Sequence, residues 1–270
     1  MSYIGGLSSY KMGVTSSLID KEAVFGQPFL AERIPMTGQD ILSHVDHTLL
    51  KPTATWEDIE ALCQEAIQYG AASVCIPPSY VKAAADKFGE NLRIGTVIGF
   101  PLGYSTTSAK GEEMQEAIED GASEIDMVIN INQVKNGNFA AVAQEIASLR
   151  EGMRAAAMMQ KMIGAEVRDT VLKVIVEACY LTQEEKIKVC HAVTDAGADY
   201  IKTSTGFGPS GATLEDVKLF KEHIGPHVKI KAAGGIRTIE EMKAYLEAGC
   251  DRIGSSAAVG LLKDRLEENV

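Results

Sequence analysis

Cysteine is scarce in this chain of 270 residues, and none of its five cysteines belongs to a CxxC pair. Their odd number and wide spacing argue against a disulfide scaffold or a zinc module. No two histidines have the HxH or HExxH spacing, so a catalytic zinc site is not expected. These absences indicate a reduced, cytoplasmic protein that needs no metal.

Long apolar runs and excess basic charge are missing as well. No run reaches the roughly 18 residues that span a bilayer, and the first residues lack a signal-peptide pattern. A formal charge of −11 and a pI near 5.0 argue against nucleic acid or an anionic membrane as partner. No Pro/Gly/Ser-rich linker divides the chain, so we expect residues 41–270 to form one domain. Residues 1–40, rich in Gly, Ser, Thr and Pro, are expected to be an N-terminal arm.

Four short passages share one pattern, in which a helical stretch is followed by glycine, a small residue and an apolar run. They are YGAASVCI, DGASEIDMVI, AGADYIKTS and AGCDRIGSS. Glycine ends a helix at low cost because it adopts the left-handed conformation freely. The gaps between the four glycines each fit about two βα units of 25 to 35 residues. The chain is therefore predicted to be built from repeated βα units.

Filling these gaps predicts eight strands separated by helices. The strands are expected near residues 43–49, 72–76, 93–98, 123–129, 171–176, 199–204, 228–231 and 252–254. Capping-box spacings predict helix starts after Thr37, Thr55, Thr182, Thr213 and Thr238, and the longest helix is expected over residues 139–163. Alternating strands and helices favour an α/β fold of the (β/α)₈ TIM-barrel type. An open doubly wound sheet is the alternative, although no GxGxxG or Walker motif follows the first strand.

Charged residues interrupt strands that should be almost entirely apolar in a buried parallel sheet. They are Glu124 and Asp126, Lys173 and Glu177, Lys202, and Lys229 and Lys231. Within each strand the charges have one parity, which places them on one face, with the apolar parity against the helices. We expect the charged face to point into the barrel and meet at its C-terminal mouth. A structural ion network is the alternative, but buried ion pairs seldom stabilise more than an apolar core does, so we favour a function.

Three lysines and an aspartate on neighbouring strands predict a specific chemistry. A lysine crowded by other ammonium groups has a lowered pKa, which leaves part of it neutral near pH 7. A neutral amine attacks a carbonyl and forms a Schiff base, whose iminium accepts the electrons of a breaking C–C bond. A carboxylate with a water then moves the protons.

Glycine-containing turns follow the last two predicted strands. KAAGGIRT places Gly234 and Gly235 after one strand, and IGSSAAVG places Gly254, Ser255 and Ser256 after the next. Loops at these two positions form the usual phosphate site of this fold, with backbone N–H groups and a helix N-terminus as donors. TSTGFG adds Thr205 and Gly206. Each glycine pair alone could be present only because its turn requires glycine, but the two together predict an anion-binding site.

Eight blocks of the sequence resemble, in order, the motifs of the deoxyribose-phosphate aldolase family. They are VDHTLLKP, SVCIPPSYV, VIGFPLG, EIDMVINI, LKVIVEA, YIKTSTGFG, KAAGGIRT and RIGSS, and they extend from about Asp46 to Ser256. The resemblance implies a class I aldolase that interconverts 2-deoxy-D-ribose 5-phosphate with D-glyceraldehyde 3-phosphate and acetaldehyde, without a cofactor, in deoxyribose phosphate catabolism. A homodimer is the expected assembly for a barrel enzyme.

The same resemblance implies roles for individual residues. Lys202 matches the Schiff-base lysine, Lys231 the lysine that lowers its pKa, and Asp126 the proton-relay acid. Lys173, Asp46 and Thr48 match further positions near the substrate, and Cys75 matches a pocket thiol that the chemistry does not require. The implied phosphate-side positions are Thr205, Gly206, Gly235, Ser255 and Ser256. His47, beside Asp46, fits a site role or a structural one equally well.

Two positions depart from the family pattern. Some members have a phosphate-binding lysine where this chain has Phe207, and some end in a tyrosine that assists proton transfer, whereas this chain ends LEENV. Two other functions fit the motifs. One is a Schiff-base aldolase on the same fold that uses a different donor, and the other is a non-catalytic barrel that senses a sugar phosphate. The intact set of Lys202, Lys231 and Asp126 argues against a sensor.

Overall fold

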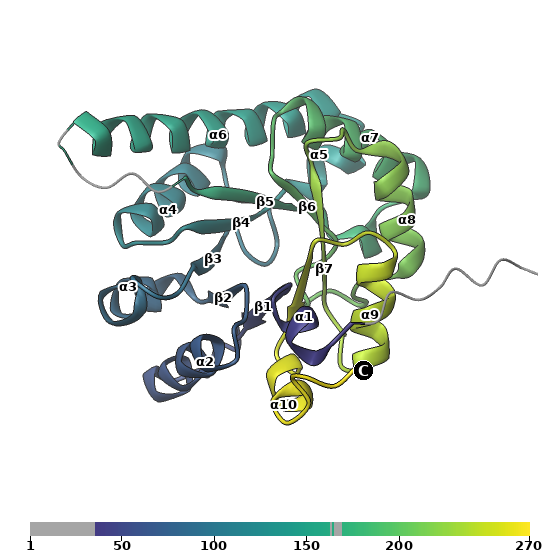
Figure 1. Cartoon of the computed structure of the whole chain (residues 1–270). Coiled ribbons are helices and arrows are strands. Elements are labelled where there is room, and N and C mark those ends of the chain that lie inside the picture. Colours follow the sequence, from purple (N-terminus) through teal and green to yellow (C-terminus); the bar gives the residue numbers. More distant parts are fainter. Residues whose placement is uncertain (1–35, 163, 165–168) are drawn as a thin grey trace, which may run out of the picture. The chain divides into compact units, whose positions relative to one another are not determined.

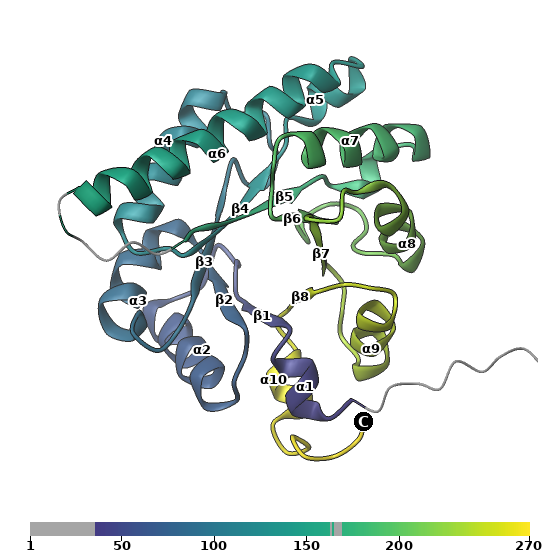
Figure 2. The ribbon, with the colours of Figure 1, turned by 45° about the horizontal axis from the view of Figure 1, so that its top comes forward.

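Eight parallel strands close into a barrel in the computed structural model, which describes residues 36–162, 164 and 169–270. The strands follow one another around the barrel in sequence order, with the helices outside them (Figures 1 and 2). They are β1 (Val45–Thr48), β2 (Ser73–Ile76), β3 (Ile94–Ile98), β4 (Glu124–Val128), β5 (Val171–Ile175), β6 (Tyr200–Lys202), β7 (Lys229–Ala233) and β8 (Arg252–Ser255). The TIM-barrel prediction is confirmed, and the open sheet is excluded.

Helices follow the strands as the repeat pattern predicts. They are α1 (Gly38–Leu42), α2 (Trp56–Gln68), α3 (Val81–Phe88), α4 (Thr107–Glu119), α5 (Ile131–Lys135), α6 (Phe139–Met162), α7 (Gln183–Asp195), α8 (Leu214–His223), α9 (Ile239–Glu247) and α10 (Ala258–Leu262), with 3₁₀ turns η1 (Pro78–Tyr80) and η2 (Ala178–Tyr180). The longest helix, α6, lies where it was expected.

Capping boxes begin four of these helices, at Thr37, Thr55, Thr182 and Thr238, as their spacing predicts. The start of α8 differs from the prediction. The Thr213 hydroxyl accepts from the Asp216 N–H at 3.1 Å, but the Asp216 carboxylate accepts from Lys186 Nζ at 2.5 Å instead of returning to the cap. An ion pair between α7 and α8 has replaced the second local bond of the box.

The hydrophobic core lies between the barrel and its helices. The apolar parity of the strands supplies it, as predicted, through fully buried residues such as Ile125, Met127, Val174, Ile201 and Ile230. Burial of apolar surface in this layer provides the main driving force for folding. The other parity is left to point into the barrel, where the charged residues gather.

The predicted arm over residues 1–40 falls largely outside the described residues and stays a prediction. Helix α1 begins before the expected boundary of the barrel at residue 41. The Gln39 N–H donates to the Leu266 carbonyl at 2.9 Å, and a Cβ on Gly38 would lie 2.5 Å from the Arg265 carbonyl oxygen. Gly38 and Gln39 therefore pack against the segment around Arg265 and Leu266 near the end of the chain.

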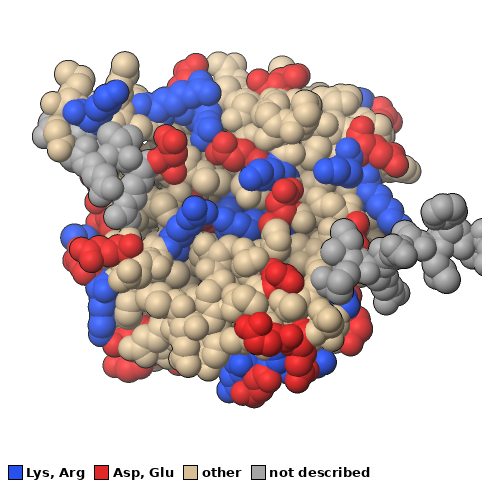
Figure 3. All heavy atoms as spheres, in the orientation of Figure 1, with Lys and Arg blue, Asp and Glu red and all other residues tan. Residues whose placement is uncertain are grey.

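Charges of both signs are interleaved on the face shown in Figure 3. None of the helices within residues 36–162 and 169–270 is long and apolar enough to cross a membrane.

Candidate active site

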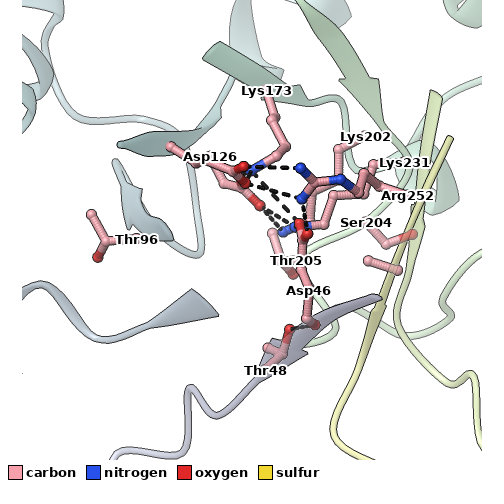
Figure 4. A network of polar contacts seen from close by, with 12 residues as sticks. Asp46, Thr48, Thr96, Asp126, Lys173, Lys202, Ser204, Thr205, Lys231 and Arg252 are labelled. Atoms are coloured by element: carbon pink, nitrogen blue, oxygen red, sulfur yellow. Dashed lines mark hydrogen bonds and ion pairs between the residues drawn. The ribbon is translucent and has the colours of Figure 1, made fainter. Parts of the chain in front are cut away.

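Asp126, on β4, lies among three lysines from the next three strands (Figure 4). Its Oδ1 accepts from Lys173 Nζ at 2.9 Å, and its Oδ2 accepts from Lys202 Nζ at 2.8 Å and Lys231 Nζ at 2.7 Å. Strand register explains the convergence, because Asp126 pairs with Lys173 and Lys202 pairs with Lys231. All four residues are at most 3% exposed. The structure thus brings together the four residues that the strand charges predicted.

Two further carboxylates and an arginine complete this network. Lys231 Nζ lies 2.5 Å from Asp46 Oδ2, and Lys173 Nζ lies 2.6 Å from Glu124 Oε2. Arg252, on β8, bridges the Asp46 and Glu124 carboxylates. The expectation of one acid among three lysines was therefore incomplete. Lys229 does not join them, because it is the exposed first residue of β7, with its Nζ over the Tyr200 ring.

The network holds four cationic side chains and three carboxylates. The cations are Lys173, Lys202, Lys231 and Arg252, and the anions are Asp46, Glu124 and Asp126. An unbalanced charge in a buried site is costly. Loss of one proton from a lysine would balance the charges, because the arginine stays protonated.

Lys202 is the lysine that the surroundings select for this loss. Burial is the largest cause that lowers its pKa; Asp126 opposes the shift and Lys231 adds to it. Burial acts on Lys231 as well, but Asp126 and Asp46 outweigh it and raise the Lys231 pKa. Lys173 behaves like Lys231, because it also faces Asp126, Asp46 and Glu124. Lys202 has one carboxylate partner where the others have at least two.

The same cations keep the central carboxylate ionised. Burial would raise the pKa of Asp126, but Lys173, Lys202 and Lys231 lower it well below its usual range. Asp46 is held low in the same way by Lys231, Lys173 and Arg252. At neutral pH both residues are therefore carboxylates.

A cavity of about 290 Å³ opens next to Lys202 at the C-terminal ends of β1, β6, β7 and β8. Its lining includes most of the residues predicted for the substrate and phosphate: Thr48, Thr205, Gly206, Gly234, Gly235, Gly254, Ser255 and Ser256. Of the charged network, Lys202 is the member that reaches this lining in the described structure. Asp46, Asp126, Lys173 and Lys231 lie buried beneath it. The lysine with the lowered pKa is thus the one that a small molecule in the cavity would meet.

The loops at one end of the cavity offer backbone donors. Gly206, Gly234 and Gly235 have φ values of +86°, +86° and +77°, which only glycine adopts readily. The N–H groups of Gly206, Gly235 and Ser256 meet no acceptor within the part of the chain that the structure describes. These N–H groups come from three different loops that line one cavity, where they are suitable donors to an anion.

Three of the predicted hydroxyl donors, those of Thr48, Thr205 and Ser255, are already engaged, whereas Ser256 is exposed. Ser255 Oγ donates to the Ile236 carbonyl and accepts from the Ala257 N–H, each at 3.1 Å. The Thr205 hydroxyl donates to Glu177, and the Thr48 hydroxyl donates to the Asp46 carbonyl at 2.7 Å. The donors left for an anion are therefore backbone N–H groups, the Ser256 hydroxyl, and the side chains of Lys51 and Arg237.

Two residues near the mouth are buried away from the cavity. Cys75, on β2, is 2% exposed, and burial raises the pKa of its thiol, so that the thiol stays protonated. His47 Nε2 lies 2.9 Å from Glu65 on α2, which favours its structural interpretation. No group of three His, Cys, Asp or Glu side chains among the described residues is placed to hold a metal ion.

Sequence reasoning missed three basic residues. Arg252 lies in the buried network, whereas Lys51 and Arg237 line the cavity from exposed positions. A signal for Arg252 was present, because it shares its parity with Gly254 in RIGSS and therefore points into the barrel. Lys51 and Arg237 lie in loops, where side chains do not alternate regularly between two faces, so the sequence does not predict where they point.

Comparison with known proteins identifies the family. Residues 41–264 match the family described as DeoC/LacD family aldolase. The chain belongs to this aldolase family. It is 56% identical over 228 residues to the deoxyribose-phosphate aldolase of Clostridium botulinum, covering 84% of this chain and 97% of that protein. It is 52% identical to the deoxyribose-phosphate aldolase of Clostridioides difficile, covering 83% and 96%.

Solved structures of aldolases resemble the chain as well. The aldolase QR15 is 37% identical, with a TM-score of 0.75, over 83% of this chain and 95% of that one. The deoxyribose phosphate aldolase of Aeropyrum pernix, described as a tetramer, is 32% identical, with a TM-score of 0.73, over 86% and 93%. Like its relatives, this protein is an aldolase on a closed barrel.

Proposed function

We propose that this aldolase cleaves 2-deoxy-D-ribose 5-phosphate to D-glyceraldehyde 3-phosphate and acetaldehyde, and catalyses the reverse addition, through a Schiff base on Lys202. The observation that carries the proposal is the position of Lys202. It is the network lysine with the lowered pKa, and it lines the cavity. The names of the relatives support the choice of substrate.

The first half of the reaction joins substrate to enzyme. Neutral Lys202 Nζ attacks C1 of the open-chain sugar, and the resulting carbinolamine loses water to give an iminium. The C3 hydroxyl then loses its proton and the C2–C3 bond breaks, which releases D-glyceraldehyde 3-phosphate. The bonding electrons pass to C2 and the iminium becomes a neutral enamine.

The second half returns the enzyme to its starting state. A proton is added to C2 of the enamine, and water hydrolyses the new iminium to acetaldehyde and free Lys202. Each time the Lys202 nitrogen becomes neutral, Asp126 loses a cationic neighbour 2.8 Å away. The pKa of Asp126 then rises toward its usual range, which lets it accept and return a proton through water.

The substrate's phosphate would lie at the far end of the cavity, on the free N–H groups of the Gly206, Gly235 and Ser256 loops. Phe207 supplies no charge there; it is half exposed and packs edge-on against Phe100 at 5.3 Å. Lys51 and Arg237 supply positive charge at this cavity instead. These two residues, from two other loops, would compensate for the positive charge that some family members have at the position of Phe207.

Borohydride trapping tests the chemistry. Incubation with 2-deoxyribose 5-phosphate and borohydride should leave a reduced adduct on Lys202, located by peptide mapping, and Lys202→Ala should lower kcat by at least about 10⁴-fold because the nucleophile is lost. Lys229→Met is the matched control and should keep both the adduct and the wild-type kcat, since Lys229 lies on the adjacent strand β7 but is exposed and outside the network. An adduct on another lysine, or none, would contradict the mechanism.

Donor choice separates this reaction from that of other Schiff-base aldolases. Acetaldehyde should be used as donor with D-glyceraldehyde 3-phosphate, whereas dihydroxyacetone and pyruvate should give no product. A phosphate-dependent rise in Tm without turnover would instead support a sugar-phosphate sensor.

We further propose a cytoplasmic homodimer acting without a cofactor. The five cysteines are all unpaired, which fits a reducing compartment. Light scattering coupled to size-exclusion chromatography would test the assembly, and the tetrameric relative makes a tetramer the main alternative.

A further inference from the structure

Glu177 has an unusual place in the site. It follows β5 directly, with φ +47° and ψ +63°, and it is the non-glycine residue with positive φ among those described. Side chains rarely adopt this left-handed conformation, which persists where the surroundings impose it and is concentrated at functional sites. Glu177 is also 2% exposed, which is costly for a carboxylate unless it is hydrogen-bonded. Both features call for a specific partner.

That partner is Thr205, three residues after Lys202. The Thr205 N–H lies 3.2 and 3.3 Å from the two carboxylate oxygens of Glu177, and the Thr205 hydroxyl donates to Oε2. The Thr205 Oγ1 in turn accepts from the Phe207 N–H at 3.0 Å. Glu177 thereby fixes the first turn of the loop that carries Gly206.

The backbone around Glu177 holds the same segment. The Val176 N–H donates to the Lys202 carbonyl at 3.0 Å, and the Ala178 N–H donates to the Thr203 carbonyl at 2.9 Å. A Cβ on Gly208 would lie 3.2 Å from the Glu177 carboxyl carbon, so the loop is packed closely against the carboxylate. The Glu177 segment thus supports the chain from the nucleophile to the end of the loop.

The loop separates two cavities. On one side lies the cavity with Lys202, and on the other lies a more apolar cavity of about 350 Å³ that Glu177, Leu102, Tyr180 and Phe207 line. Thr205 and Phe207 border both. Glu177 therefore contacts the loop from the side opposite the proposed phosphate.

Electrostatics excludes a role for this carboxylate as a phosphate ligand. Two anions repel each other, most strongly where water is excluded. Because Glu177 takes both the N–H and the hydroxyl proton of Thr205, neither is left for the phosphate. Of the loop residues that line the Lys202 cavity, Phe207 also donates its N–H to Thr205, so the N–H that remains there among the described contacts is that of Gly206.

We propose that Glu177 is the positioning residue of the phosphate site. Through Thr205 it holds the Gly206 loop in the geometry that presents the Gly206 N–H to the phosphate. The inference rests on the proposed function, since it concerns the phosphate end of the same substrate.

The test compares a phosphorylated with an unphosphorylated substrate. In Glu177→Ala, the ratio of kcat/KM for 2-deoxyribose 5-phosphate to that for 2-deoxyribose should fall by at least tenfold. Glu177→Gln, which keeps one acceptor oxygen for Thr205, should cause a smaller fall, and it serves if the alanine variant does not fold. Borohydride trapping of acetaldehyde on Lys202, which involves no phosphate, should keep its wild-type rate.

Asp199→Asn is the matched control. Asp199 precedes β6 at the other end of the strand, and its carboxylate accepts from the Leu172 N–H at 2.8 Å and from Arg150. Its substitution should lower Tm while leaving the substrate ratio unchanged. If the Glu177 variants behave like Asp199→Asn, Glu177 is only structural and the proposal is wrong.

Thr205→Val decides whether Glu177 acts through Thr205. If it does, the double variant Glu177→Ala/Thr205→Val should have the same ratio as Glu177→Ala alone. If the two substitutions instead lower the kcat/KM ratio independently, so that their effects multiply in the double variant, Thr205 binds phosphate itself and the proposal is wrong. The rise in Tm caused by inorganic phosphate reports on the same site without turnover. That rise should be smaller in Glu177→Ala than in wild type. The two proposals can fail separately: absence of a borohydride-trapped adduct in wild type would contradict the aldolase mechanism alone, whereas an unchanged rise in Tm in Glu177→Ala would contradict the role of Glu177.

Discussion

Lys202 differs from its two neighbouring lysines in its partners rather than in its depth. All three are at most 3% exposed, so burial alone would lower the pKa of each. Lys173 and Lys231 recover their charge because at least two carboxylates face each of them, whereas Lys202 faces Asp126 alone. The choice of nucleophile thus follows from where the strands place Asp46 and Glu124.

Lys231→Met should move the acid limb of the pH profile of kcat/KM to higher pH by on the order of one unit. The substitution removes a cation that lowers the Lys202 pKa, and it leaves Asp126 with fewer partners, so that Asp126 attracts the Lys202 proton more strongly. Both effects raise the pKa of Lys202, and less of it is neutral at a given pH. The profile is measured from pH 5 to 10 beside Lys229→Met, which should match wild type; an unchanged limb in Lys231→Met would refute the tuning role.

The loops after β6 and β7 act as one element at the phosphate end. The Ala212 N–H donates to the Ala233 carbonyl at 3.1 Å and the Gly234 carbonyl at 3.2 Å. A Cβ on Gly211 would lie 2.0 Å from the Gly234 carbonyl oxygen. The two glycine-containing turns can approach this closely because no side chain stands between them.

Gly211→Ala should therefore raise KM for 2-deoxyribose 5-phosphate by about tenfold and lower the free energy of unfolding by about 1–3 kcal/mol, because the loops must move apart. Steady-state kinetics and urea unfolding measure the two effects. Gly260→Ala, on α10, is the control, since its Cβ would meet no atom within 4 Å. A normal KM in Gly211→Ala would show that the phosphate site does not depend on this contact.

Elements were predictable from sequence where local signals decide them. Strand positions followed the repeated pattern of helical stretch, glycine and apolar run, and four capping boxes followed their spacing. Asp216 could not be predicted, because its carboxylate prefers a lysine on the neighbouring helix to its own cap. Glu177 has the parity of an inward-facing strand residue, yet the chain turns there and sends its carboxylate to Thr205. In both cases the deciding partner is distant in sequence.

Across the whole molecule, strand register assembles the buried network from seven side chains. Six strands contribute: β1, β4, β5, β6, β7 and β8. Parity predicts that each charge points inward, and the sequence therefore located Lys173, Lys202, Lys231 and Asp126. Parity does not predict height along the barrel axis. Height separates exposed Lys229 from buried Lys231, and it decides that Arg252 pairs with Asp46 and Glu124.

The network should make the stability of the barrel depend steeply on pH in acid. Asp46 and Asp126 have pKa values below those of the unfolded chain, so each takes up a proton when the protein unfolds. Their contribution to stability is complete above the unfolded value of about 4, and it is lost as pH falls from there toward their folded pKa values. In this window each carboxylate adds up to about 1.4 kcal/mol per pH unit to the slope of the unfolding free energy.

Asp46→Asn tests this, because it removes one of the two titrating carboxylates while the amide keeps the shape of the side chain. Urea unfolding between pH 4 and pH 2.5 should show a shallower slope in the variant than in wild type. The absolute stability should also fall, because Lys231 and Arg252 each lose an ionised partner. Glu240→Gln, at an exposed position on α9, should leave the slope unchanged. Equal slopes in wild type and Asp46→Asn would mean that charges outside the barrel, not the network around Lys202, govern unfolding in acid.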